Sequence, residues 1–159
     1  MSASFLDAAL LDGLVTQARS VPRRRAHHNL HTDLAAPAQR LLVAMEPDSF
    51  VRPHLHRDPH KAETLVILRG RLGVLLFAPD GSVIGTRLLV PGGACLGYDV
   101  APGCLHAVIA LEPGSVFLEA KAGPYIPLAA AEIPAWSPAE DSPEAAGCLR
   151  RWAALFTSA

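Results

Sequence analysis

The sequence predicts an all-β fold, an antiparallel sandwich or barrel, and three observations support this. Eight or nine short apolar segments follow one another between residues 24 and 125, at about ten-residue spacing. Turn residues separate these segments, and Pro79-Asp80-Gly81 between two apolar runs predicts a hairpin. No strand-like segment alternates with a helical one, which disfavours a Rossmann-like parallel sheet.

A short helix is predicted before the strands. Over residues 4–19, Phe5, Leu10 and Leu14 recur at helical spacing, Ser4 can cap the helix, and Val21-Pro22 ends it. This stretch has no basic leader and is a poor signal peptide, and no apolar run approaches the roughly 20 residues that cross a bilayer. We therefore expect residues 1–22 to form a helical segment that packs on the barrel.

The barrel itself is predicted over residues 23–126. Its strand-like segments are RAHHNLH, QRLLVAME, SFVRPHLH, ETLVILRG, RLGVLLFA, SVIGTRLLV, ACLGYDV, HAVIAL and SVFLEAK. The run Arg23–Arg25 precedes the first of them, and a solvated strand entry is favoured over a phosphate or carboxylate site. His27 and His28 are interpreted as surface or packing residues.

A Pro- and Ala-rich tail over residues 127–159 is predicted to wrap the surface and to end in a short helix. Pro143 and Glu144 suit the first turn of that helix. One side of it carries Leu149, Trp152, Leu155 and Phe156, which could pack on the barrel or on a second subunit. All three segments are expected to form one structural domain.

Composition restricts the class of protein. Of 159 residues, 50% are hydrophobic and 18% are charged, so charge-driven disorder is excluded and one sizeable core is possible. A net charge of −1 argues against a protein that coats nucleic acid or an anionic membrane. Cys95, Cys104 and Cys148 form no Cys-x-x-Cys pair and no disulfide framework, which favours a reducing cytoplasm.

The strongest chemical signal is Pro53-His54-Leu55-His56, followed later by Glu63 and Gly70. Residues two apart on a strand point to the same face, so His54 and His56 suit one metal ion. Glu63 opens the next strand-like segment, and an antiparallel return could bring its carboxylate beside the histidines. A buried charge at that place needs a partner, which a metal ion supplies.

A second signal is Pro102-Gly103-Cys104-Leu105-His106, in which a turn delivers a histidine to the start of a strand. Val108 and Ala110 share the face of His106 and are apolar, so this face is expected inside the barrel. Three imidazoles and one carboxylate suit a divalent first-row metal with one or two open positions. The sequence therefore predicts a metal site made of His54, His56, Glu63 and His106.

These two motifs resemble those of the cupin superfamily, whose members are small jelly-roll barrels. Over about 130 residues, RRRAHHNLH, QRLLVAMEPDSFVRPHLH, ETLVILRGRLGVLLF and GCLHAVIALEPGSVFLEAKAGPY resemble the WbuC-type cupin fold metalloproteins. The resemblance implies a cupin jelly roll with one Fe, Zn, Mn or Ni ion, and an association with surface-polysaccharide (O-antigen) gene clusters. The sequence departs from most cupins in its long gap between His56 and Glu63, which the WbuC group shares, and in Ala110, where Asn is usual.

Alternatives remain for several residues. His60 could replace Glu63 as a ligand, and Cys104 is more easily read as a small apolar filler. Glu119 and Lys121 could be a pocket acid and base or a structural ion pair, with the structural interpretation slightly favoured. The ligand-binding candidates are Asn29, His31, Gln39, Arg40 and Tyr125.

Two functions follow from this pattern. One is a metal-dependent enzyme on a small sugar-like or carboxylate molecule, with isomerase-like, epimerase-like or Fe(II) oxygenase-like chemistry. The other is a ligand-binding or regulatory cupin without turnover. A purely structural metal is a weaker third reading, because structural zinc sites prefer four closed ligands. A small-molecule ligand and a homodimer formed through sheet edges are the expected partners.

Overall fold

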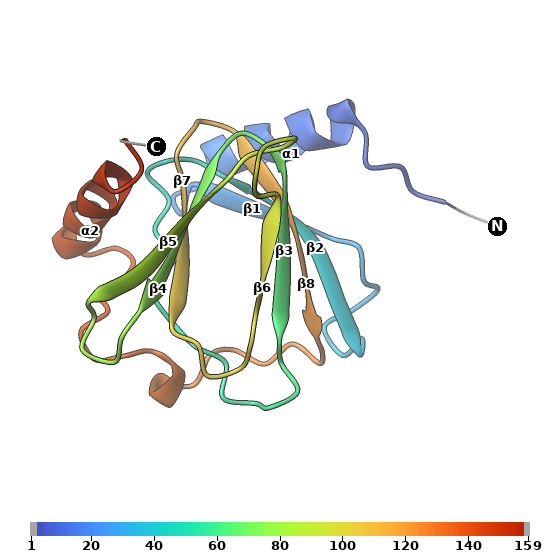
Figure 1. Cartoon of the computed structure of the whole chain (residues 1–159). Coiled ribbons are helices and arrows are strands. Elements are labelled where there is room, and N and C mark those ends of the chain that lie inside the picture. Colours follow the sequence, from blue (N-terminus) through green and yellow to red (C-terminus); the bar gives the residue numbers. More distant parts are fainter. Residues whose placement is uncertain (1–2, 158–159) are drawn as a thin grey trace.

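The computed structural model of the chain describes residues 3–157 and contains two antiparallel sheets that face each other (Figure 1). The larger sheet has the order β1-β2-β8-β3-β6 and the smaller one β5-β4-β7. The strands are β1 (Arg25–Asn29), β2 (Ala38–Met45), β3 (Glu63–Arg69), β4 (Leu72–Phe77), β5 (Val83–Leu89), β6 (Gly97–Val100), β7 (His106–Ala110) and β8 (Ser115–Ala122). The all-β prediction is confirmed.

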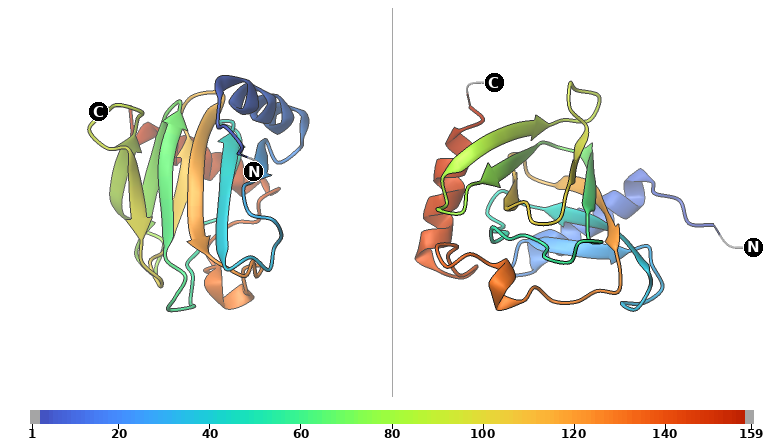
Figure 2. Two further views of the ribbon diagram at one scale, coloured as in Figure 1. Left: turned by 90° about the vertical axis from the view of Figure 1, so that its right-hand side faces the viewer. Right: turned by 60° about the horizontal axis from the view of Figure 1, so that its bottom comes forward.

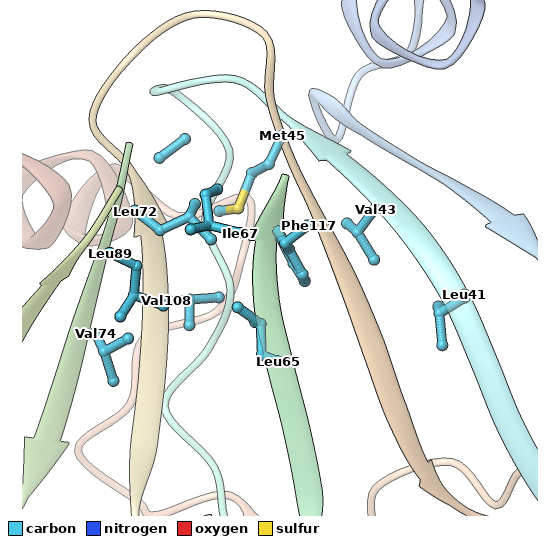
Figure 3. Packing of buried hydrophobic residues seen from close by; sticks show 11 residues of the cluster. Leu41, Val43, Met45, Leu65, Ile67, Leu72, Val74, Leu89, Val108 and Phe117 are labelled. Atoms are coloured by element: carbon cyan, nitrogen blue, oxygen red, sulfur yellow. The ribbon is translucent and has the colours of Figure 1, made fainter. Parts of the chain in front are cut away.

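The interior between the sheets is apolar at one end and polar at the other. Figure 3 shows the apolar part, which consists of Leu41, Val43, Met45, Leu65, Ile67, Leu72, Val74, Leu89, Val108, Ala110 and Phe117. At the other end, Lys121 of β8 pairs in register with Gln39 of β2 and with Glu63 of β3. Strand register thus brings three polar residues into one row, at the end where a site can form.

The predicted hairpin at Asp80-Gly81 joins β4 to β5. Gly81 has a φ of 90°, a left-handed conformation that glycine adopts without steric cost. The Asp80 carboxylate accepts a hydrogen bond from the Ser82 amide at 2.9 Å, which closes the turn. Here the local sequence specifies both the turn and the pairing of the two strands.

Helix α1 (Ala8–Ser20) begins later than predicted. Asp7, and not Ser4, is the N-cap, because its carboxylate accepts a hydrogen bond from the Leu10 amide at 2.9 Å. The buried side of the helix carries Leu14, Val15 and Ala18, which pack in one cluster with Ala26, Leu42 and Ala44 on the outer face of β1 and β2. The helix therefore fixes β1 against its neighbour from outside.

The segment SFVRPHLH is not a strand, contrary to the prediction. Pro53 has no amide hydrogen to donate to a sheet, and only one isolated bridge forms, between His54 and His106. Both backbone hydrogen bonds of that bridge are present, at 3.1 and 3.0 Å. The loop is thus attached to the start of β7 by one point of pairing.

The C-terminal tail crosses the lower end of the sheets in Figure 1 through a short 3-10 helix, η1 (Ala130–Glu132), and ends in α2 (Pro143–Ala154). Trp152 and Phe156 pack on the smaller sheet in one cluster with Leu75 and Phe77, whereas Leu155 is about half exposed. Helices α1 and α2 lie on opposite sides of the barrel (Figure 2). The predicted segments 1–22 and 127–159 each include two terminal residues that lie outside the described range.

Within residues 3–157, no helix has the length and apolar character needed to span a membrane.

Candidate functional site

Three histidines gather at the polar end of the barrel. His54 and His56 come from the loop before β3, and His106 opens β7. One ligand atom from each can be chosen so that all three lie within 4.8 Å of one another. This spacing is compatible with a single metal ion held between them.

The tail braces the loop that carries two of these histidines. The Leu55 amide, between His54 and His56, donates a hydrogen bond to the Glu132 carbonyl at 3.0 Å. The Glu132 carboxylate accepts a further bond from the Arg57 amide at 2.8 Å. Because Glu132 lies far along the chain from this loop, no local pattern predicts its part in positioning the site.

Hydrogen bonds orient two of the three imidazoles. His54 Nδ1 lies 2.8 Å from the Arg52 carbonyl, and His106 Nδ1 lies 2.9 Å from the Cys104 carbonyl. A carbonyl can only accept, so both Nδ1 atoms carry the proton and both Nε2 atoms have a free lone pair. Backbone carbonyls commonly orient metal-binding histidines in this way.

Two imidazole nitrogen atoms of the three-histidine cluster have no protein partner. His106 Nε2 and His56 Nδ1 are buried and form no hydrogen bond with any residue from 3 to 157. Buried polar atoms without a partner are uncommon in folded proteins and call for an explanation. The donor set and its orphaned nitrogens therefore fit a metal ion.

The protonation state of the histidines also favours a metal site. Burial, together with the nearby His106, lowers the pKa of His54 to about 4. Burial also lowers the pKa of His106, although the negative Glu63 works in the opposite direction. Both imidazoles are thus neutral at pH 7, which is the form that binds metals.

Glu63 is next to this cluster and almost fully buried, with 5% of its surface exposed. Its carboxylate lies 3.2 Å from His56 Nε2 and 3.9 Å from His106 Nε2. Burial raises the pKa of Glu63, but the hydrogen bond with His56 and the charge of Lys121 outweigh it, so the pKa lies below its ordinary value. Glu63 is therefore an ionised carboxylate within reach of two of the three histidines.

Lys121 connects Glu63 to a second carboxylate. Its Nζ lies 3.4 Å from Glu63 and 2.5 Å from Glu119. Burial lowers the pKa of Lys121, but the two carboxylates outweigh this and raise it, so Lys121 is a cation. Burial and the negative Glu63 raise the pKa of Glu119. The arrangement is one ammonium shared by the buried Glu63 and the half-buried Glu119.

A cavity of about 370 Å³ opens beside these groups. Glu63, His54 and His106 line it, as do Glu119 and Lys121. The structure also places four of the five predicted ligand-binding residues along its wall: Asn29, His31, Gln39 and Tyr125. This size falls at the low end of the range for small-ligand pockets.

Three predicted residues have other surroundings. Arg40 is exposed on the face of β2 opposite to Gln39, and its guanidinium donates to the Leu30 carbonyl, so it does not line the cavity. His60 is exposed in its loop and is not part of the three-histidine cluster. Cys104 holds His106 through its backbone carbonyl, and its side chain is not among the cavity-lining groups.

Sequence reasoning missed two groups of cavity residues. Tyr98 of β6 lines the cavity near His106, with ring centroids 6.3 Å apart, and its buried hydroxyl has no partner within the described chain. Arg23, Arg25 and His27 also line the cavity, contrary to the prediction of a solvated strand entry and of surface or packing roles. Alternation along RAHHNLH was a possible signal, because every second residue from Arg25 is polar.

The family model described as "Domain of unknown function (DUF6016)" matches residues 6–89 of the chain. No curated protein matches the chain.

Three solved structures illustrate the similarity in fold. KdgF from Halomonas sp. aligns with a TM-score of 0.50 and 19% identity over 67% of this chain and 85% of its own. A recombinant oxalate oxidase in complex with glycolate has a TM-score of 0.53 and 16% identity, over 79% of this chain but only 60% of the oxidase. A conserved protein of unknown function from Streptococcus pyogenes has a TM-score of 0.51 and 16% identity, over 79% and 92%. These similarities confirm the cupin jelly roll as the fold and, at such low identities, carry no activity across.

Proposed function

The chain belongs to the DUF6016 family. From the histidine cluster and the cavity beside it, we propose that it is a metal-binding cupin that takes up a small carboxylate or sugar-like ligand. His54, His56 and His106 hold one divalent ion, and Glu63 is the fourth ligand. The ligand enters the cavity beside the ion. The metal is Fe, Zn, Mn or Ni.

One observation carries the proposal. Two backbone carbonyls fix the protons of His54 and His106 on Nδ1, which directs unshared Nε2 lone pairs into a buried three-histidine cluster. A packing role for these histidines would leave His106 Nε2 desolvated without compensation, at a cost of about 1–3 kcal/mol. A bound ion removes that cost.

When bound, a divalent ion supplies a Lewis acid that polarises an oxygen atom of the ligand. The protein's own residues then determine how the ligand lies. The Tyr98 hydroxyl, whose pKa is raised by burial, stays protonated and can donate a hydrogen bond to that ligand. Lys121 keeps Glu63 ionised and oriented, through its contact at 3.4 Å.

A second candidate is a binding or regulatory cupin without turnover. The observation that favours it is the 2.5 Å contact between Glu119 and Lys121. Each of these two catalytic candidates is engaged by the other, so neither is a free acid or base in the cavity. An enzyme would have to separate them when its ligand binds.

Finer predictions from the sequence belong to the same proposal. They are the WbuC subtype, a role in surface-polysaccharide (O-antigen) biosynthesis, a cytoplasmic location and a homodimer. Support for the ligand class comes from the cavity itself, in which Arg25, Asn29 and Lys121 offer hydrogen-bond donors beside the histidines.

Metal analysis tests the site. We expect wild-type protein that has been loaded with zinc and dialysed to retain about one ion per chain, and the His54→Ala/His106→Ala variant to retain none. His60→Ala is the matched control, because His60 is exposed and outside the cluster, and it should bind like wild type. Circular dichroism of all three proteins checks the fold.

Stoichiometric zinc in the folded double variant would overturn the ligand assignment. Loss of zinc in His60→Ala, together with its retention in Glu63→Gln, would instead assign the fourth position to His60.

A further inference from the structure

Strand β1 presents polar side chains at every second position on the side of the cavity. Arg25, His27 and Asn29 alternate along the strand and His31 continues the series, and all four line the cavity. We refer to these four residues as the β1 stripe. Neighbouring strand β2 instead points mainly apolar residues at the same cavity, namely Leu41, Val43 and Met45. An uninterrupted polar stripe beside an apolar wall is a recognition surface rather than a core.

Arg25 is the permanent cation of the stripe, and only 8% of its side chain is exposed. Its Nη1 donates to the Phe50 carbonyl at 3.0 Å and to Glu140 at 2.6 Å, so the guanidinium is held in place. Within residues 3–157, the Nε and Nη2 atoms of Arg25 form no hydrogen bond with the protein, and both keep some accessible surface. A fixed guanidinium with free N–H groups is well suited to a carboxylate.

The charges around the cavity favour an anion. Arg23, Arg25 and Lys121 line the cavity together with Glu63 and Glu119, and Glu140 contacts the two arginines from outside the lining. Glu140 is shared by Arg23 and Arg25, so one of these two positive charges is not neutralised locally. A divalent ion at the histidines would add two further positive charges. The loaded cavity is therefore positive at both ends.

His31 gives an independent sign of a ligand. Only 8% of the residue's surface is exposed, and its Nδ1 lies 3.0 Å from the Arg40 amide and 2.9 Å from the Arg40 carbonyl. Nδ1 is thus satisfied in either tautomer, whereas Nε2 is buried and has no partner in the described chain. An oxygen atom of a ligand can satisfy Nε2, as donor or as acceptor.

We propose that the β1 stripe recognises the acidic end of the ligand. Arg25 binds its carboxylate, and Asn29 and His31 bind its hydroxyl or carbonyl oxygens. This inference rests on the proposed function, which places the other end of the ligand at the metal ion.

The size of the cavity restricts the ligand further. Arg25 and two of the three clustered histidines line one cavity of about 370 Å³, which is far more space than a two-carbon acid fills. The ligand class is a hydroxy acid longer than two carbons, such as a sugar acid.

The test uses zinc-loaded full-length protein and isothermal titration calorimetry. The probes are glycolate, tartrate, gluconate and glucuronate, with glucose as the neutral counterpart of glucuronate. We expect at least one of the three longer acids to bind, and glycolate and glucose to bind more weakly. Arg25→Gln should weaken the binding acid by about 10- to 100-fold, as expected for a lost hydrogen bond to a charged group, without loss of zinc.

Two variants serve as controls. Arg87→Gln removes an exposed arginine of β5 that does not line the cavity, and it should bind the acid like wild type. Asn29→Ala changes an exposed stripe residue with little risk to the fold and should weaken binding severalfold. It keeps the proposal testable if Arg25→Gln does not fold.

Zinc retention separates the possible failures. If the wild type binds no zinc, the proposed function fails. If zinc binds but none of the acids does, or if the stripe variants bind the acid as tightly as wild type, the inference about β1 is wrong. A change of oligomeric state in the stripe variants, with unchanged acid binding, would assign the stripe to a contact between chains and equally overturn the inference.

Discussion

Replacing Lys121 by methionine should destabilise the metal-free protein strongly. The substitution keeps most of the side-chain volume but removes the one positive charge among residues 3–157 that contacts both Glu63 and Glu119. At an effective dielectric constant of 20, contacts at 3.4 and 2.5 Å correspond to roughly 5 and 7 kcal/mol before desolvation is subtracted. Desolvation of the three groups offsets most of this, and loss of one partner of a buried pair costs about 3–5 kcal/mol. For Lys121→Met we expect a loss of about 3 kcal/mol in the free energy of unfolding, at the low end of this range, because Glu119 can take up a proton and lose its charge.

Urea denaturation at pH 7.5 with a chelator, followed by tryptophan fluorescence, measures this free energy of unfolding. The control is the Glu119→Gln/Lys121→Met double variant, which removes both charges of the shorter pair. It should be more stable than Lys121→Met by more than 1 kcal/mol, since replacing both partners is far less costly than orphaning one. If Lys121→Met unfolds within 1 kcal/mol of wild type, the three groups do not form the charge network described above.

Three further predictions concern stability. Tyr98→Phe should raise the unfolding free energy of the metal-free protein by about 1 kcal/mol, because the buried hydroxyl has no partner, and a loss in urea titrations would show that it has one. Trp152→Ala should lower the free energy of unfolding by about 3–5 kcal/mol, because Trp152 is buried and stacks on Phe50 with ring centroids 5.6 Å apart. The half-exposed Leu155 is the control, and Leu155→Ala should lower it by under about 0.5 kcal/mol, so equal losses would contradict the packing of α2. Burial raises the pKa of Glu140, but hydrogen bonds from Arg23 and Arg25 outweigh it and bring the pKa to about 2. The stabilisation by the ionised Glu140 is present above pH 4.5 and is lost as the pH falls through 2. Glu140→Gln should therefore lower the free energy of unfolding by roughly 1–2 kcal/mol at pH 7, after allowance for the partial exposure of Glu140, and by almost nothing at pH 2. A loss that does not depend on pH would refute this reasoning.

Local patterns carried much of the fold and part of the candidate site. The strands were predictable because apolar runs and turn residues act within a few positions, as at Asp80-Gly81. His54, His56 and His106 were recognisable from the spacing of two short motifs, and the structure brings them together. The start of α1 was predicted too early, because Ser4 and Asp7 are both good caps and the sequence does not decide between them.

Other features depended on pairing between distant segments. Gln39 and Arg40 are adjacent polar residues at a strand start, and only the register of β2 against β8 decides which of them faces the cavity. Lys121 meets Glu63 because β8 pairs with β3. Tyr98 reaches the cavity because β6 is the edge strand beside β3. None of these contacts has a local sequence signal.

Local patterns are enough to predict an all-β chain with two histidine motifs, since periodicity, turns and ligand spacing are properties of neighbouring residues. Pairing between distant strands is what joins Lys121 to both Glu63 and Glu119 and turns Arg25 and the rest of the β1 stripe toward the cavity that His54 and His106 line. The physical reason is that the direction of a side chain changes with every residue along a strand. A shift of one position in register would turn the stripe to the opposite face of the sheet.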